Sequence, residues 1–240
     1  FKYQTKTETQ TLDVNTFEYQ HNGTHYVKFH TSFHQSKKEK YTDFVFSLAK
    51  KRYDFLFNKY KQRHNLGFKS EPGTDFNSKC FILCLRYYML ESYNQQLAVP
   101  PQFYNFIMNT YNANMELFAS SINTSLINYC SLFPDIESEF GSRGSFWNLK
   151  IIQGMYTANP PFSNDIMEKM AHKMIDSLDK SKHDLGFIVT IPAWDKDEHK
   201  YGIYKPLYIL KKCSYLVSLI RLPKSKAVFY DYLLNKKINP

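Results

Sequence analysis

The sequence lacks a hydrophobic leader and any apolar run long enough to span a bilayer, so we expect neither secretion nor insertion into a membrane. Cysteine is scarce as well: only four of the 240 residues are cysteine, and no second pair stands at the spacing of a zinc site. The sequence therefore predicts no metal site and no disulfide framework. It favours a reducing, intracellular compartment.

Acidic residues are the minority among the charged ones, with 22 Asp and Glu against 31 Lys and Arg, which gives a formal net charge of +9. Such a balance favours a polyanionic partner, for which the phosphate backbone of a nucleic acid is the usual case, although solubility is an alternative explanation. Aromatic residues are abundant at 17%. Most of these rings are expected in the core, and some are available to stack on bases.

The N-terminal part, residues 1–112, is expected to be a β-hairpin followed by helices. Asn22-Gly23 stands between two alternating segments, which is a strong signal for a tight hairpin turn. The first expected helix carries a basic face that includes Lys50, Lys51 and Arg52; this face either contacts a substrate phosphate or is simply solvated. The expected elements are a frayed arm over 1–12, strands over 17–20 and 24–29, helices over 43–62, 78–93 and from Pro101 onward, and a loop over 67–77.

The second part, residues 113–240, predicts an α/β domain. Short apolar runs alternate here with helical stretches, an order typical of a mostly parallel sheet with helices packed on it. The clearest helix covers residues 164–178, with Ser163 as its expected N-cap and Asp165 near its positive start. The strands are expected over 115–119, 155–158, 185–191, 215–220 and 227–232.

The tetrapeptide Asn159-Pro160-Pro161-Phe162 lies between an expected strand and a helix start, which is where open α/β sheets place their ligands. An adenine N6 amine is a poor nucleophile, because its lone pair is delocalised into the ring, and it has two hydrogens to donate. The side-chain oxygen of Asn159 and the backbone carbonyl of Pro160 can accept one each and aim the lone pair at a methyl donor. The prolines stiffen the loop, and Phe162 can stack on the base. These four residues are the candidate catalytic set, with a turn that has no chemistry as the alternative.

Two further segments are typical of a cofactor site. Small polar residues follow the first expected strand of the α/β part and let the backbone approach a bound molecule closely. Residues 140–146 form a flexible basic loop, with two glycines around Arg143 and an aromatic residue at each end, suited either to hold a cofactor or a phosphate or to be a plain surface turn.

Five ordered blocks of the sequence resemble the phosphorylated-CTD-interacting-factor family of cap-specific adenosine N6-methyltransferases. The resemblance covers residues 80–195 well and the flanks loosely, and the order and spacing of all five blocks agree. The blocks are LFASSIN (117–123), YCSLFPD (129–135), FGSRG (140–144), ANPPF (158–162) and GFIVTIPAW (186–194).

The resemblance implies a Rossmann-like class I methyltransferase sheet, preceded by a mainly helical domain with a β-hairpin. It implies S-adenosyl-L-methionine as the cofactor. The substrate would be an mRNA whose 7-methylguanosine cap is followed by 2′-O-methyladenosine, and the transcription or capping machinery is an implied partner. The candidate cofactor contacts are Phe118, Ala119, Ser120, Asn123, Phe140, Gly141, Ser142 and Asn159. The candidate substrate contacts are Arg143, Trp194, Lys50, Lys51 and Arg52.

Because the sequence departs from the family pattern in several places, other acceptors of the methyl group remain alternatives. No segment looks like the WW module of animal members, Ser121 replaces a family proline, and the residues after Trp194 diverge. We expect a compact viral or protist member, in the nucleus, or in the cytoplasm if it is viral. The alternatives are an N6-adenine methyltransferase acting on DNA or internal RNA, and a catalytically inactive RNA-binding subunit of a capping complex.

Overall fold

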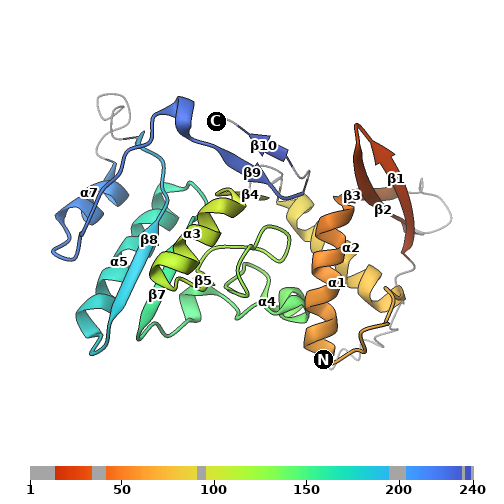
Figure 1. Ribbon diagram of the computed structural model, residues 1–240, viewed down its shortest axis with the longest axis horizontal. Coiled ribbons are helices and arrows are strands. Elements are labelled where there is room, and N and C mark those ends of the chain that lie inside the picture. Colours follow the sequence, from red (N-terminus) through yellow and green to blue (C-terminus); the bar gives the residue numbers. More distant parts are fainter. Residues whose placement is uncertain (1–13, 34–41, 91–95, 195–203, 234–235, 239–240) are drawn as a thin grey trace, which may run out of the picture.

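The computed structural model describes residues 14–33, 42–90, 96–194, 204–233 and 236–238. The fold is mixed α/β, with an antiparallel sheet near the N-terminus, a parallel sheet of four strands, and a third sheet that joins distant parts of the chain. Figure 1 shows the N-terminal sheet at one end of the molecule and the parallel sheet toward the other, with helices α1 and α2 between them. The expected arm over 1–12 lies outside the described residues.

The N-terminal sheet confirms the predicted hairpin. Strands β1 (Asn15–His21) and β2 (Thr24–Phe33) pair antiparallel around Asn22 and Gly23. The φ angles of these two residues are 47° and 76°, the positive values that a two-residue turn between twisted strands requires. Asparagine and glycine are the residues that adopt such angles at least cost, so the turn follows directly from the sequence.

Strand β3 (Thr42–Ala49) pairs with β2, and helix α1 (Lys50–His64) begins directly after it. The prediction of a helix over 43–62 is therefore wrong for residues 43–49. Phe46 and Leu48 are buried whereas Val45 is 43% exposed, which is the alternation of a strand with one face on the core. The apolar residues of this segment fit both the helical repeat and the two-residue repeat of a strand. Pairing with β2 decides in favour of the strand.

Helix α2 (Thr74–Met89) packs with α1 to build the N-terminal core. It begins four residues before the expected start, so the predicted loop over 67–77 is wrong for its last four residues. Asp75 in the first turn stabilises this start, and Phe76 is buried in the core. The same core takes in Ile122, Ile136 and Phe140, so the two predicted parts of the chain share it.

The parallel sheet has the order β6-β5-β7-β8 and confirms the expected mostly parallel arrangement. Its strands are short: β5 (Met115–Glu116), β6 (Asn128–Tyr129), β7 (Gly154–Ala158) and β8 (Leu185–Val189). The first expected strand, 115–119, therefore ends at Glu116, and the chain turns into a loop.

Helices cover both faces of this sheet. On one face α5 (Asn164–Lys180) buries Met170 and Met174 against a cluster that includes Tyr156. On the other face α3 (Pro101–Tyr111) buries Ile107 in a cluster that includes Met155. Met155 and Tyr156 are consecutive in β7 and so point to opposite faces. Both helices begin where the sequence predicts. Ser163 occupies the N-cap position of α5, although its side chain makes no capping hydrogen bond.

The C-terminal part differs most from expectation. Residues 215–220 are not a strand, and helix α7 (Lys205–Lys212) packs beside α5. Strand β9 (Phe229–Asp231) lies within the expected strand 227–232. It pairs with β4 (Leu97–Ala98) and β10 (Lys236–Ile238) rather than joining the parallel sheet. This pairing brings the C-terminal segment across the molecule to the start of α3 (Figure 1).

Candidate active site

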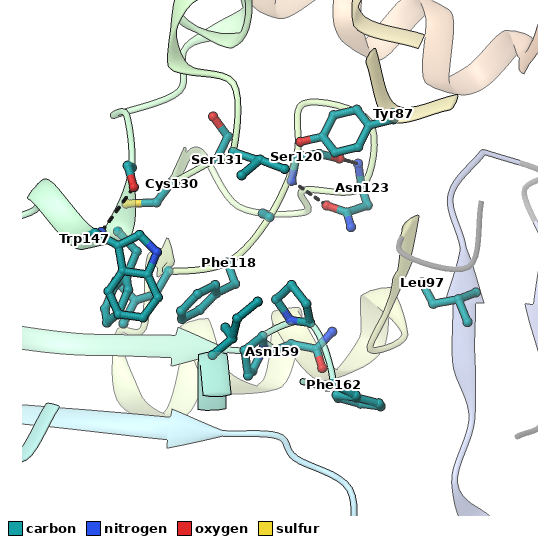
Figure 2. Close-up of a pocket in the computed structure, with 18 of the residues that line it drawn as sticks. Tyr87, Leu97, Phe118, Ser120, Asn123, Cys130, Ser131, Trp147, Asn159 and Phe162 are labelled. Atoms are coloured by element: carbon teal, nitrogen blue, oxygen red, sulfur yellow. Dashed lines mark hydrogen bonds between the residues drawn. The ribbon is translucent and has the colours of Figure 1, made fainter. Parts of the chain in front are cut away.

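A cavity of about 650 Å³ opens at the carboxyl ends of β5 and β7. The segments that leave these two neighbouring parallel strands form facing walls of the cavity, as Figure 2 shows. This is the edge at which open α/β sheets bind ligands. The lining residues are Tyr87, Leu97, Leu117, Phe118, Ala119, Ser120, Asn123, Cys130, Ser131, Leu132, Ser145, Phe146, Trp147, Asn159, Pro160, Pro161, Phe162, Ile166 and Phe229.

Asn159 follows the last residue of β7, and its side-chain oxygen Oδ1 is buried without a hydrogen-bond partner among the described residues. A buried polar atom without a partner costs roughly 1–3 kcal/mol, so it points to a ligand that supplies the missing donor. The amide hydrogen of Ser163 bonds to the carbonyl of Pro161 at 2.7 Å, which closes the turn before α5. The tetrapeptide is thus held between a strand and a helix in the wall of the cavity, and it carries a buried acceptor without a partner among the described residues.

Phe162 forms an aromatic rim beside Asn159. Its side chain is 41% exposed, and its ring packs edge-on against Trp194 at 6.2 Å and Phe229 at 6.1 Å between centroids. Trp194 does not line the cavity itself, but its ring contacts those of Phe162 and Tyr204. Such a rim offers a flat apolar face at the mouth of the site.

The loop after β5 is a closed hydrogen-bond network. The backbone N–H of Ser120 donates to Oδ1 of Asn123 at 2.7 Å. Oγ of Ser120 accepts the amide hydrogens of Ile122 at 3.1 Å and Asn123 at 3.0 Å, and it donates to Oε1 of Gln96 at 2.6 Å. This network holds Ser120 and Asn123 on the side of the cavity opposite Asn159 (Figure 2).

The other end of the cavity is an aromatic cluster. Phe118 lies 4.6 Å from Phe146 and 6.0 Å from Trp147 between ring centroids. Lys173 of α5 donates hydrogen bonds to the carbonyls of Phe146, Trp147 and Leu149 at 2.6, 2.8 and 3.1 Å, and its ammonium lies 4.7 Å from the Phe146 ring. The helix that begins at the tetrapeptide thereby also fixes the aromatic wall.

The first part of the expected glycine loop, residues 140–144, lies behind the wall rather than in it. Phe140 is fully buried in the N-terminal core, and neither Gly141 nor Ser142 lines the cavity. Ser142 acts indirectly, because its hydroxyl bonds to that of the lining residue Ser131 at 2.6 Å. Arg143 is turned toward β6, where its guanidinium donates to Oδ1 of Asn128 at 2.9 and 3.2 Å.

The expected basic face of α1 divides into three different environments. Lys50 is paired with Asp54 and Glu18, and Lys51 is exposed. Arg52 is only 8% exposed, so its expected place on a solvated face is wrong. Its guanidinium is covered because it bonds to the carbonyl of Thr124 and stacks on two aromatic rings.

Two buried carboxylates support the loop after β5. Glu116 accepts hydrogen bonds from the Thr124 hydroxyl and from the backbone amides of residues 125 and 126. Glu137 accepts from the hydroxyl of Tyr87 at 2.6 Å and from the backbone N–H of Ser121 at 2.5 Å. Burial raises the pKa of both carboxyl groups, while these hydrogen bonds oppose the shift. The donors hold the loop in one conformation.

Sequence reasoning missed most of the lining that comes from outside the family-like blocks. Tyr87, Leu97 and Phe229 reach the cavity from α2, β4 and β9. Phe146 closes the predicted loop 140–146 and lines the cavity, whereas Trp147, the next residue, was not predicted. Among the described residues, no cluster of His, Cys, Asp and Glu is suited to a metal ion, and no helix is long and apolar enough to cross a membrane.

The fold and the cavity together define a mixed α/β protein with a cavity at the carboxyl edge of a parallel sheet. A sequence model of the family described as "Phosphorylated CTD interacting factor 1 WW domain" matches residues 52–231, and the chain belongs to this family. That range includes every residue that lines the cavity.

Two curated relatives are similar over part of the chain. Proteins from Mus musculus and Homo sapiens, both named mRNA (2′-O-methyladenosine-N(6)-)-methyltransferase, are each 33% identical to it over 125 residues. The matched region is 50% of this chain and 18% of each relative, so the chain spans less than a fifth of the relatives' length.

Proposed function

We propose that this chain is an S-adenosyl-L-methionine-dependent methyltransferase domain of the Rossmann-like class I type, acting on the N6 amine of an adenosine in RNA. The observation that carries the proposal is the unpartnered, buried Oδ1 of Asn159 beside two prolines at the end of β7. An N6 amine is a donor of the kind that this acceptor lacks.

The cavity fits a methyl donor of this kind. Its volume of about 650 Å³ lies within the range of small-molecule sites. The aromatic cluster of Phe118, Phe146 and Trp147 suits the adenosine half, and the polar wall of Ser120 and Asn123 suits the amino-acid half. When bound, S-adenosyl-L-methionine supplies an electrophilic methyl group on a sulfonium.

The residues around Asn159 orient the acceptor base. Oδ1 of Asn159 accepts one N6 hydrogen and the carbonyl of Pro160 accepts the other, which draws the nitrogen toward a tetrahedral shape and turns its lone pair out of the ring plane. Phe162 stacks on the base, supported by Trp194. The lining has no charged side chain, so the reaction depends on alignment rather than on a general base.

We further propose that the acceptor is the 2′-O-methyladenosine next to an mRNA cap. The relatives' printed names and membership of the same family support this choice. Lys51 and Arg143 are exposed on the described surface and remain candidate phosphate contacts. The transcription or capping machinery remains the candidate macromolecular partner.

The test uses labelled S-adenosyl-L-methionine with capped RNAs that begin in A or in G. We expect label only in the RNA that begins in A, at N6. Asn159→Ala removes the acceptor and should abolish transfer while RNA binding persists, whereas Asn164→Ala, at an exposed position of α5, should leave the rate unchanged. Equal labelling of both RNAs would remove the adenosine assignment. Preferential labelling of uncapped RNA or duplex DNA would favour a different acceptor.

A further inference from the structure

We propose that residues 215–222 bind an extended, apolar segment of another protein that carries acidic residues at both ends. None of these residues lines the cavity, so the inference goes beyond the proposed function and does not depend on it. The segment joins α7 to β9, and Figure 1 shows this connection on the outside of the molecule. The hydroxyl of Tyr215 donates a hydrogen bond of 2.7 Å to Asp179, which fixes the beginning of the segment to α5.

The apolar side chains of this segment are largely exposed. Six of its eight residues are apolar, and Val217 and Ile220 are 98% and 80% exposed. The other four are between 42% and 65% exposed: Tyr215, Leu216, Leu219 and Leu222. Single exposed apolar residues are ordinary on a protein surface, whereas a contiguous run of them marks an interaction site.

The backbone of the segment is available for pairing as well. Residues 217–220 belong to no helix or strand, and their N–H and C=O groups make no hydrogen bond within the described part of the chain. Such a stretch is a template for an added strand. A membrane would cover the side chains but leave these backbone groups without hydrogen bonds. A single-stranded RNA would stack on aromatic rings, whereas Val217, Ile220 and Leu222 are aliphatic.

The charges around the segment select an acidic partner. Lys212 precedes it, and Lys224 and Lys226 follow it in the short 3₁₀ helix η5 (Lys224–Lys226). All three lysines are exposed and form no ion pair among the described residues. Residues 205–230 contain no Asp or Glu. A strand with carboxylates beyond both ends of its apolar part would therefore meet the opposite charge at each end.

The same charges disfavour a second copy of this chain as the partner. If two copies paired antiparallel through residues 215–222, Lys212 of one copy would face Lys224 and Lys226 of the other. In a parallel pair, each lysine would lie near its own counterpart. Like charges placed opposite each other destabilise a strand pair, and the net charge of +9 on each copy adds to the repulsion.

The test is a fluorescence-anisotropy titration of the whole chain with a labelled synthetic peptide of alternating Val and Thr that has Glu at both ends. We expect saturable binding that weakens as salt is added. Two altered peptides should bind at least about 10-fold more weakly. One has Lys in place of Glu and reverses the charge, and the other has Pro at alternate positions and loses backbone donors.

Variants of the chain test the surface itself. Ile220→Ser should weaken binding of the Glu-flanked peptide roughly 10-fold, because the peptide no longer buries this apolar side chain. Lys224→Gln should weaken binding less and should reduce its dependence on salt. Ile127→Ser is the matched control, since Ile127 is 76% exposed and lies outside the segment, and it should leave binding unchanged.

Several results would overturn the inference. If the Glu-flanked peptide did not bind, or the Pro-containing one bound equally well, the segment would not pair with an added strand. Sedimentation as a dimer that Ile220→Ser dissociates would assign the surface to a second copy. Binding of the segment to phosphatidylserine vesicles, or displacement of the peptide by capped RNA, would assign it to a membrane or to RNA. None of these measurements uses methyl transfer, so they leave the proposed function untouched.

Discussion

The guanidinium of Arg52 donates a hydrogen bond of 3.1 Å to the backbone carbonyl of Thr124, and this contact joins α1 to the loop that follows β5. The same group lies 4.3 Å from the Phe55 ring and 4.5 Å from the Tyr232 ring. Burial lowers the pKa of Arg52 to about 10, so the side chain remains charged at neutral pH. A buried cation with these partners connects the helical part, the loop at the cavity and the C-terminal segment.

Arg52→Met is therefore expected to destabilise the fold rather than to weaken RNA contacts. We expect the free energy of unfolding in urea to fall by about 2–4 kcal/mol, because a charged hydrogen bond and two cation–π contacts are lost in a buried position. Lys51→Met, at the exposed neighbouring position, should change it by less than about 0.5 kcal/mol. A stable Arg52→Met chain with weakened RNA binding would instead support a substrate contact.

Lys59 is expected to make the stability of the chain depend on pH in the alkaline range. Its ammonium donates to the carbonyls of Leu126 and Ile127 at 3.3 and 3.2 Å, and burial lowers its pKa to about 8, below the roughly 10.4 of an unfolded chain. Between these values the unfolded chain binds more protons, so the free energy of unfolding rises with pH through this window and is flat below it.

Lys59→Met removes this dependence. We expect urea unfolding to show that the free energy of unfolding of the unmodified chain, relative to that of the variant, increases from pH 7 to pH 9.5. Lys51→Met is the control for removing a lysine from the exposed face of the same helix. A difference that is constant between the two pH values would show that Lys59 titrates as an exposed lysine does.

Lys173→Met is expected to loosen the aromatic wall of the cavity. The variant loses three hydrogen bonds to the backbone of residues 146–149, so Trp147 and Phe146 are no longer fixed to α5. We expect S-adenosylhomocysteine and 5′-methylthioadenosine to bind roughly 3- to 30-fold more weakly, both by a similar factor. Lys180→Met, which removes only an exposed ion pair with Asp176, is the control. Weakening confined to S-adenosylhomocysteine would contradict the assignment of this wall to adenosine.

Phe162→Ala is expected to raise the KM for capped RNA more than it lowers kcat. One stacked base contributes about 1–3 kcal/mol, which corresponds to a roughly 5- to 150-fold change. Phe162→Tyr keeps the ring and should restore most of the affinity. Steady-state kinetics with the RNA varied at saturating cofactor separates the two constants, and an effect on kcat alone would place Phe162 in alignment rather than in binding.

The central part of the site could be predicted because its signal is local. Asn159-Pro160-Pro161-Phe162 needs only the strand before it and the helix after it, and both are strongly patterned. The loop after β5 could also be predicted from local residues. Its small polar residues point to close backbone approach, and the structure places Ser120 and Asn123 at the cavity.

The remainder of the site depends on contacts between residues far apart in the chain. The spacing of apolar residues along the sequence does not predict such contacts. Arg52 sits in a lysine-rich run that predicts a solvated face, yet partners 72 and more residues away in the chain bury it. Phe140 belongs to a glycine loop that predicts a ligand contact, yet the N-terminal core takes its ring. The apolar residues of segment 43–49 fit both the helical repeat and the strand repeat, and only the pairing with β2 shows that the segment is a strand.

Because β4 pairs with β9, the cavity is completed late in folding. Leu97 and Phe229 form parts of one cavity rim but come from early and late portions of the polypeptide. During synthesis, the N-terminal helices and the parallel sheet leave the ribosome before β9 does, so the rim closes as a late event. A ligand that contacts both Leu97 and Phe229 is expected to favour the docked C-terminal strand over its detached form, and so to stabilise the completed fold.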